Sequence, residues 1–134
     1  MLDDRNTQPD ANIAPFAIWS YDDNITGWSA LLGSSQIGTD SVSPVAAADR
    51  MTVEDAQGLP PAYIDVGELD IFRDEDLEYA KKLGQAGVSC EFHLLPGVPH
   101  GFEAFAPDSE VARRTMERRC RAITSITSSV SSKL

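Results

Sequence analysis

The sequence predicts an α/β fold organised around one strand–helix–strand unit, and three observations support this prediction. Residues 62–67 form a short run rich in β-branched and aromatic side chains, which is typical of a buried strand. Residues 88–95 alternate between apolar and polar side chains, which indicates a second strand. A helical pattern fills the interval between the two runs. Strands joined by such a crossover are expected to be parallel, with a right-handed connection.

Composition and charge narrow the classes of partner. The chain of 134 residues has a formal net charge of −10. Neither nucleic acid nor an anionic membrane is an expected partner, because both are recognised by basic side chains. No stretch approaches the ~20 apolar residues that cross a bilayer, and the first residues lack the pattern of a secretory signal. Two cysteines, Cys90 and Cys120, are too few for a disulfide framework, so the reducing cytoplasm is the expected location.

Residues 1–59 are expected to combine loops with one helix. Apolar side chains recur at helical spacing from Ile25 to Leu32, and Gly33 is expected to stop the helix. Candidate N-caps of this helix are Asp22, Asp23 and Asn24. The segment that follows is rich in Gly, Ser, Thr and Asp. This composition favours an irregular connection with one short helical turn near residues 46–50.

The strand–helix–strand unit and its loops occupy residues 60–106. Asp74 is the candidate cap of the helix, and the neighbouring carboxylates favour the positive end of the helix dipole. Gly87 is suited to the left-handed conformation that ends a helix. The two strands are expected to lie side by side in one sheet.

One amphipathic helix with a frayed tail is expected over residues 107–134, beginning at Pro107 and Asp108. Its predicted apolar face consists of Ala112, Met116, Cys120, Ile123 and Thr127. The Ser-rich end from Ser125 is expected to fray. Because two strands are too few for a self-contained parallel sheet, residues 1–134 are expected to be part of a larger domain.

Two loops that follow the predicted strands carry the side chains of chemical interest. Asp70 lies in the loop after the first strand, and His100 lies in the loop after the second. In open parallel sheets, sites form at the carboxyl ends of the strands, where side chains from neighbouring loops converge. A carboxylate that accepts a hydrogen bond from a histidine ring is the base-orienting half of a catalytic triad. Asp70 alone is more typical of a turn or a helix cap, and His100 alone of a solvated loop residue, so the prediction of a site rests on the pair.

Motifs around these two residues resemble the C-terminal part of the hormone-sensitive-lipase-like esterases, the fold-3 branch of the α/β-hydrolases. They are Leu-Pro-Pro-Ala-Tyr-Ile at 59–64, Gly-Glu-Leu-Asp-Ile-Phe-Arg-Asp-Glu at 67–75 and His-Gly-Phe at 100–102. Residues 1–6 resemble the segment directly after the sixth strand of that fold, and the resemblance extends to about residue 124. It implies a partial α/β-hydrolase fold with a flanking N-terminal helix and a C-terminal amphipathic helix. The order of Asp before His also matches that fold.

The resemblance implies a parent protein that hydrolyses carboxylic esters with a Ser–Asp–His triad. Asp70 is then the triad acid and His100 the general base, with Phe102 packed beside the histidine. Trp28 and Phe102 are the candidate substrate-pocket residues. Trp28 lies in a stretch that approaches the acyl pocket in this family, although packing is its simpler role. The implied substrate is a small carboxylic ester, and neither a metal nor an organic cofactor is implied.

The nucleophile and the oxyanion loop of the family are missing from this sequence. The family's serine lies in a Gly-x-Ser-x-Gly elbow, and the nearest segments here, residues 33–37 and 87–91, lack the final glycine. No glycine cluster is present that could offer oxyanion-stabilising amides. The chain is therefore expected to supply only the acid and the base, and to be inactive by itself.

The same residues are also compatible with interpretations other than an esterase. The chain can instead be a non-catalytic remnant that self-associates or binds a partner through an exposed sheet edge. It can also be one half of a split enzyme whose serine and oxyanion loop come from a second polypeptide. His93 is expected to be structural because it lies mid-strand. Cys90 and Cys120 are expected to be packed thiols rather than nucleophiles. The acidic run 74–78 is expected to be a charged helix start and not a metal site.

Overall fold

The computed structural model describes residues 1–131, with side chains as far as Ser125. The chain divides into two compact units, Met1–His100 and Gly101–Leu134. The first unit contains the short 3-10 turns η1 (Ala14–Phe16) and η2 (Ala48–Arg50), the helices α1 (Tyr21–Leu32) and α2 (Arg73–Gln85), and the strands β1 (Ala62–Gly67) and β2 (Cys90–Leu95). The second unit contains the helices α3 (Phe102–Phe105) and α4 (Glu110–Ser131). Among the described residues, no helix is both long and apolar enough to span a membrane.

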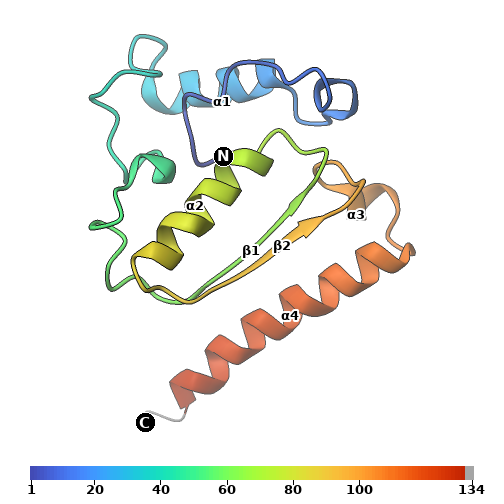
Figure 1. The fold of residues 1–134 in the computed structure, drawn as a ribbon. Helices are drawn as coiled ribbons and strands as arrows, with labels where there is room; N and C mark the ends of the chain where they lie inside the picture. The colour runs from blue at the N-terminus through green and yellow to red at the C-terminus, as the bar shows by residue number, and fades with distance from the viewer. Residues whose placement is uncertain (132–134) are drawn as a thin grey trace. The chain divides into compact units, whose positions relative to one another are not determined.

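The two strands pair in parallel, which confirms the predicted strand–helix–strand unit (Figure 1). The register runs from Ala62 opposite Cys90 to Gly67 opposite Leu95, so both strands end at the same edge of the sheet. Within residues 1–131, the sheet consists of these two strands. The chain connects them through α2, as a parallel pair requires.

The first unit contains three apolar clusters of buried residues, and two of them involve residues of β1. One is centred on Leu83 of α2, which is 1% exposed and packs with the partly buried Ala62 and Ile64 of β1. The second lies at the carboxyl end of β1 and consists of Ile13, Tyr21, Val66, Ile71 and Phe72. Removal of these side chains from water is the main driving force for closing the unit. The loop that follows β1 therefore begins beside tightly packed apolar side chains.

The end of α2 determines where β2 begins. Gly87 has a φ of 77°, as predicted, and the amide of Val88 donates to the carbonyl of Leu83 at 2.9 Å. Val88 is thus used to close the helix and packs in the Leu83 cluster. Because of this, β2 starts at Cys90, and the predicted start at Val88 is wrong.

The start of α2 is set by Asp70 rather than by the predicted cap, Asp74. Oδ1 of Asp70 accepts the amide of Phe72 at 3.0 Å, and its carbonyl accepts the amide of Arg73 at 3.1 Å. Asp74 lies inside the first turn, where its carboxylate pairs with Arg73. The prediction of an Asp74 cap is wrong because the preceding aspartate already closes the turn that enters the helix.

A capping box formed by Ser20 and Asp23 begins α1. Ser20 Oγ accepts the Asp23 amide at 3.1 Å, and Asp23 Oδ2 accepts the Ser20 amide at 3.0 Å. The predicted N-caps are wrong, since all three lie inside the helix: Asp22, Asp23 and Asn24. Gly33, with a φ of 81°, ends the helix as predicted.

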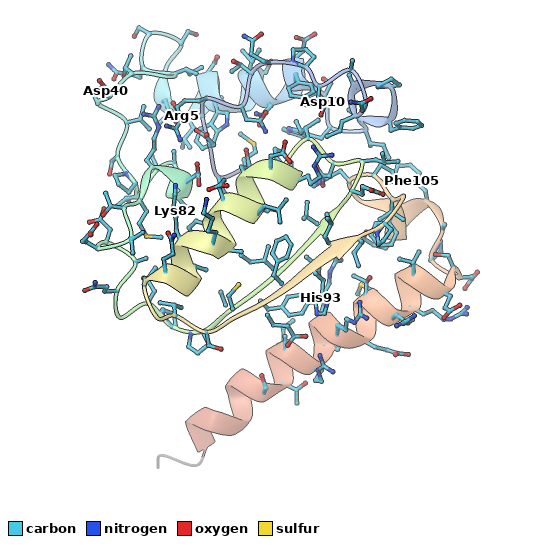
Figure 2. The ribbon with its side chains drawn as sticks, in the orientation of Figure 1. Arg5, Asp10, Asp40, Lys82, His93 and Phe105 are labelled. Atoms are coloured by element: carbon cyan, nitrogen blue, oxygen red, sulfur yellow. The ribbon has the colours of Figure 1, made fainter. Side chains whose placement is uncertain are left out.

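The short helical turn predicted near residues 46–50 is present as η2, and ion pairs tie it to distant segments. Arg50 donates to both carboxylate oxygens of Asp4, at 2.7 and 2.8 Å, and Asp4 is fully buried. Burial alone would raise the pKa of Asp4, but its hydrogen bonds, chiefly from Arg50, lower the pKa below its ordinary value. Lys82 reaches from α2 toward η2 (Figure 2) and donates to Asp49 Oδ1 at 2.8 Å.

In the second unit, α4 begins at Glu110, and the predicted start at Pro107 and Asp108 is wrong. The local reason is Ser109, whose hydroxyl accepts the amide of Ala112 at 3.3 Å in the manner of an N-cap. Because Ser109 is the cap, Pro107 lies before the helix and not inside it.

The predicted apolar face of α4 is only partly correct. Ala112 is buried, but the buried residue one turn further on is Thr115. Three predicted members of the face are exposed: Met116, Cys120 and Ile123. Thr127, the fifth, lies beyond the described side chains. The helix continues to Ser131, and the rest of the segment expected to fray, residues 132–134, lies outside the described residues.

Replacing Gly67 with alanine is expected to destabilise the first unit. A Cβ at this position would lie 2.2 Å from the carbonyl oxygen of Val98 in the loop after β2. The loop would have to move, and overpacking of this kind costs about 1–3 kcal/mol. Urea denaturation followed by circular dichroism measures the change.

Gly84→Ala is the matched control for this substitution. Gly84 lies inside α2 with open space around its Cβ position, so alanine is expected to raise the free energy of unfolding by about 0.5–1 kcal/mol. A Gly67→Ala variant as stable as the parent would contradict the close approach of the two loops.

Asp76 makes stability depend on pH. It lies two turns before Leu83 on the same side of α2 and is half-buried. Burial, with the charges of Glu75, Asp70 and Asp65, raises the pKa of Asp76 to about 7. The folded chain therefore holds a proton that the unfolded chain has already released. The contribution of Asp76 to the free energy of unfolding falls as the pH rises from about 4 to 7.

Asp76→Asn is expected to raise the free energy of unfolding at pH 8 by on the order of 1–3 kcal/mol, because no charge then has to be buried. The advantage should shrink as the pH falls toward about 4 and disappear below that, where the parent carboxyl is protonated in both states. Urea titrations at a series of pH values measure it, with the exposed Asp74→Asn as control. Equal stability of Asp76→Asn and the parent at pH 8 would rule out the buried charge.

Candidate active site

The loops that follow β1 and β2 are joined to each other directly beyond the sheet. The amide of Glu68 donates to the carbonyl of Leu95 at 2.9 Å, and the amide of Leu69 donates to the carbonyl of Val98 at 3.1 Å. These bonds continue the pairing of the strands past Gly67. The two loops are therefore bonded to each other as far as Leu69, the residue before Asp70, and Val98, two residues before His100.

A carboxylate adds a further link between the loops. Oε2 of Glu68 accepts the amide of Gly97 at 2.8 Å. Gly97 has a φ of 69°, which glycine adopts without strain. The contact clamps the turn after β2 onto the loop after β1, two residues before Asp70. Glu68 belongs to the motif at 67–75, but the sequence assigned it no role, because its contact is with a loop distant in the chain.

Asp70 and His100 meet at the end of these joined loops. Oδ2 of Asp70 lies 2.8 Å from Nδ1 of His100, although the residues are 30 positions apart. Asp70 is 4% exposed, and its other oxygen accepts the Phe72 amide. A carboxylate in its ionised form can only accept hydrogen bonds, and a neutral ring that donates to it from Nδ1 has Nε2 as its acceptor. The structure thus brings together the two residues that the sequence singled out.

The histidine ring is oriented by an aromatic neighbour as well as by the carboxylate. The ring of Phe72 meets the ring of His100 edge-on, with centroids 5.4 Å apart and an interplanar angle of 81°. The His100 side chain is nevertheless 47% exposed, so it is accessible to a reacting group. Sequence reasoning missed Phe72 and named Phe102, which is buried in the second unit. That Phe102 also packs beside the histidine stays a prediction.

His93 provides an internal comparison. Its Nε2 lies 2.8 Å from Oε1 of Glu91, two residues away on the same strand, and its ring lies 5.6 Å from that of Tyr63. The side chain sits on a strand and not at a strand end, as Figure 2 also shows. A histidine–carboxylate contact alone does not define a site. The position of Asp70 and His100 at the carboxyl ends of the strands distinguishes the two pairs.

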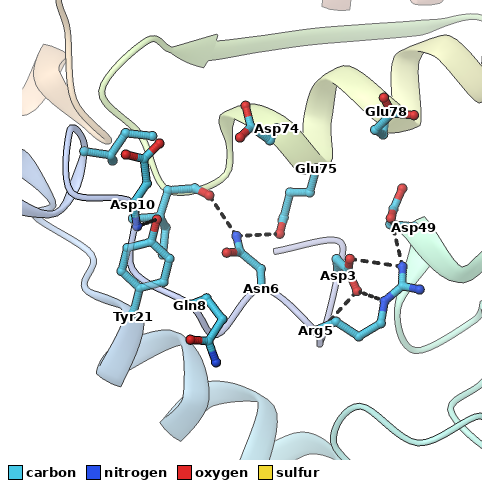
Figure 3. A pocket seen from close by; sticks show the side chains of 12 residues that line it. Asp3, Arg5, Asn6, Gln8, Asp10, Tyr21, Asp49, Asp74, Glu75 and Glu78 are labelled. Carbon is cyan, nitrogen blue, oxygen red and sulfur yellow. Dashed lines mark hydrogen bonds and ion pairs between the residues drawn. The ribbon is translucent and has the colours of Figure 1, made fainter.

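The other candidate residues lie elsewhere. Trp28 is 1% exposed and packs in a cluster with Val42 and Ala47, so its role in an acyl pocket stays a prediction. A cavity of about 300 Å³ lies between the start of the chain and α2 (Figure 3), and neither Asp70 nor His100 lines it. Within residues 1–131, no group of three or more His, Cys, Asp or Glu side chains is placed to hold a metal ion.

The free cysteines show no sign of activation. Cys90 is partly buried, and burial raises the pKa of its thiol. A raised pKa lowers the fraction of reactive thiolate at neutral pH. Cys120 is exposed on α4, which is contrary to the expectation of a packed thiol because that position does not belong to the buried side of the helix.

Comparisons with known proteins give a consistent result. A model of the alpha/beta hydrolase fold family matches residues 1–104. The carboxylesterase NlhH of Mycobacterium tuberculosis (strain ATCC 25618 / H37Rv) is 46% identical over 52 residues, 39% of this chain and 16% of the relative. The hormone-sensitive lipase of Bos taurus is 30% identical over 79 residues, 59% of this chain and 10% of the lipase.

A solved structure extends the likeness to most of the chain. A bacterial heroin esterase has 39% sequence identity and a TM-score of 0.78, and the match covers 88% of this chain and 37% of the esterase. The chain thus matches much less than half of the length of each of these proteins. The family match includes both strands, the crossover helix and the two loops beyond the strands. This chain belongs to the hormone-sensitive-lipase-like branch of the α/β-hydrolase fold family.

Proposed function

We propose that this chain supplies the acid, Asp70, and the general base, His100, of the Ser–Asp–His triad of a carboxylic ester hydrolase. The observation that carries the proposal is the 2.8 Å contact between the two side chains at the carboxyl ends of adjacent parallel strands. Membership of a family whose named relatives include a carboxylesterase and a lipase supports the reaction class.

In the proposed reaction, a serine attacks the carbonyl carbon of a small carboxylic ester. His100 takes the serine proton at Nε2 and returns it to the leaving alcohol. Asp70 holds the ring by accepting the Nδ1 hydrogen and stabilises the imidazolium that forms. The burial of Asp70 strengthens this interaction, because little water competes for the carboxylate. Phe72 limits rotation of the ring through its edge-on contact.

The serine and the oxyanion donors of that reaction must come from outside this sequence, which contains no Gly-x-Ser-x-Gly segment. The 134-residue chain by itself is therefore expected to show no His100-dependent hydrolysis of 4-nitrophenyl butyrate. His100→Ala measures the background of the assay. Turnover that disappears in His100→Ala, or covalent labelling by a fluorophosphonate probe, would show an overlooked nucleophile.

The acid–base pair is tested directly by the pKa of His100. Asp70→Asn removes the charge that stabilises the imidazolium, so the pKa of His100 is expected to fall by about one unit or more. Titration of histidine-labelled chain by NMR measures it, and His93, paired with Glu91, is the internal control. An unchanged His100 pKa in Asp70→Asn would sink the proposed pairing.

Self-association through the sheet is the second candidate function. The observation that favours it is the small size of the sheet, which has two strands within residues 1–131. In a sheet of two strands each strand is an edge strand, and edge strands are sites for pairing with another chain. Light scattering over a range of concentrations is expected to show a dimer if this function holds. A monomer at all concentrations would exclude it.

A further inference from the structure

The loop that carries Asp70 is held from the start of the chain. Residues 2–6, the N-terminal strap, run beside the beginning of α2, and Asn6 ends the strap (Figure 3). The side-chain amide of Asn6 donates to the carbonyl of Ile71 at 2.8 Å and to Oε2 of Glu75 at 3.0 Å. Ile71 is the residue that directly follows Asp70.

Asn6 contacts the same peptide group that orients the Asp70 carboxylate. The carbonyl of Ile71, which accepts from Asn6, and the amide of Phe72, which donates to Oδ1 of Asp70 at 3.0 Å, belong to one peptide unit. A peptide unit is planar, so its carbonyl and its amide turn together. A hydrogen bond that fixes the carbonyl therefore fixes the direction in which the amide points at Asp70.

Asn6 is itself fixed on two sides. The backbone carbonyl of Asn6 accepts a hydrogen bond from the side-chain amide of Asn24 at 2.8 Å, and Asn24 is fully buried in α1. On the other side, Asn6 is bonded to Glu75, whose side chain is 3% exposed. Oε1 of Glu75 accepts the backbone amide of Leu2. The strap is thereby attached at both of its ends to Glu75, so Asn6 has little freedom to move away from Ile71.

We propose that Asn6, braced by Glu75, is a positioning residue for the Asp70–His100 pair, acting through the peptide unit between Ile71 and Phe72. The catalytic meaning of this role rests on the proposed function. Without Asn6, the Ile71 carbonyl loses its partner at the strap, and the peptide unit is free to turn toward another donor. Asp70 then loses the amide that holds one of its oxygens, and the other oxygen no longer points steadily at His100.

Asn6→Ala in the full chain tests the proposal without changing any charge. The pKa of His100, measured by NMR on histidine-labelled chain, is expected to move about half of the way from the parent value to the value in Asp70→Asn, because the imidazolium loses an aligned acceptor. The Nδ1 proton of His100 should also exchange faster with water. A residue that only stabilises the fold would change neither quantity at a temperature where the chain is folded.

Ser109→Ala is the matched control, because it removes the hydroxyl that caps α4 and costs about 1 kcal/mol of stability, while the hydrogen bonds of that hydroxyl go to Ala106 and Ala112 and not to the strap or the Asp70 loop. This variant should melt at a lower temperature and keep the parent pKa of His100. His93 reports on changes that affect both histidines alike.

The outcomes separate the inference from the proposed function. A folded Asn6→Ala variant with the parent pKa of His100 would overturn the inference, provided that Asp70→Asn lowers that pKa. An unchanged pKa in Asp70→Asn would overturn the proposed function and the inference with it. If Asn6→Ala does not fold, hydrogen exchange in the parent chain is the test. The proposal requires the Asn6 side-chain amide to be protected from exchange with water. Rapid exchange of that amide would overturn the inference.

Discussion

The parallel pairing of β1 with β2 is the constraint on which the rest of the site depends. Because the register ends both strands at one edge, the loops beyond them leave side by side. Backbone bonds from Glu68 and Leu69 extend the pairing past the strands, and the absence of a side chain at Gly67 allows the close approach. Asp70 and His100 meet only because these loops cannot diverge.

Buried polar groups connect the segments that surround this edge. Asp4 is fully buried against Arg50, and Glu75 is buried against the amides of Leu2 and Asn6. Desolvation of a carboxylate is costly, so such groups add little net stability even when they are well bonded. Their hydrogen bonds have fixed directions, however, and they define where the N-terminal strap lies on α2. Apolar packing closes the first unit, and these directional contacts select one arrangement of its loops.

The two histidines show why the place of a contact matters more than its length. His93 and His100 each lie 2.8 Å from a carboxylate oxygen. The partner of His93 is two residues away on the same strand, so that contact needs no particular tertiary fold. The partner of His100 is on another loop, is nearly completely buried, and has its second oxygen bonded to the backbone. The second arrangement holds the ring through a buried carboxylate and leaves the His100 side chain 47% exposed, compared with 24% for His93.

The sequence by itself determined the two strands, the helix between them, the left-handed glycine that ends this helix, and the candidate pair Asp70 and His100. These features depend on periodicity, turn residues and loop position, which are local properties of the chain. Only the tertiary structure decided that Asp70 accepts the Phe72 amide just before α2, that Phe72 faces the histidine, and that Asn6 reaches the loop of Asp70. Each of these contacts depends on backbone direction or on segments far apart in the chain. Spacing along a sequence does not encode such geometry, because packing creates it.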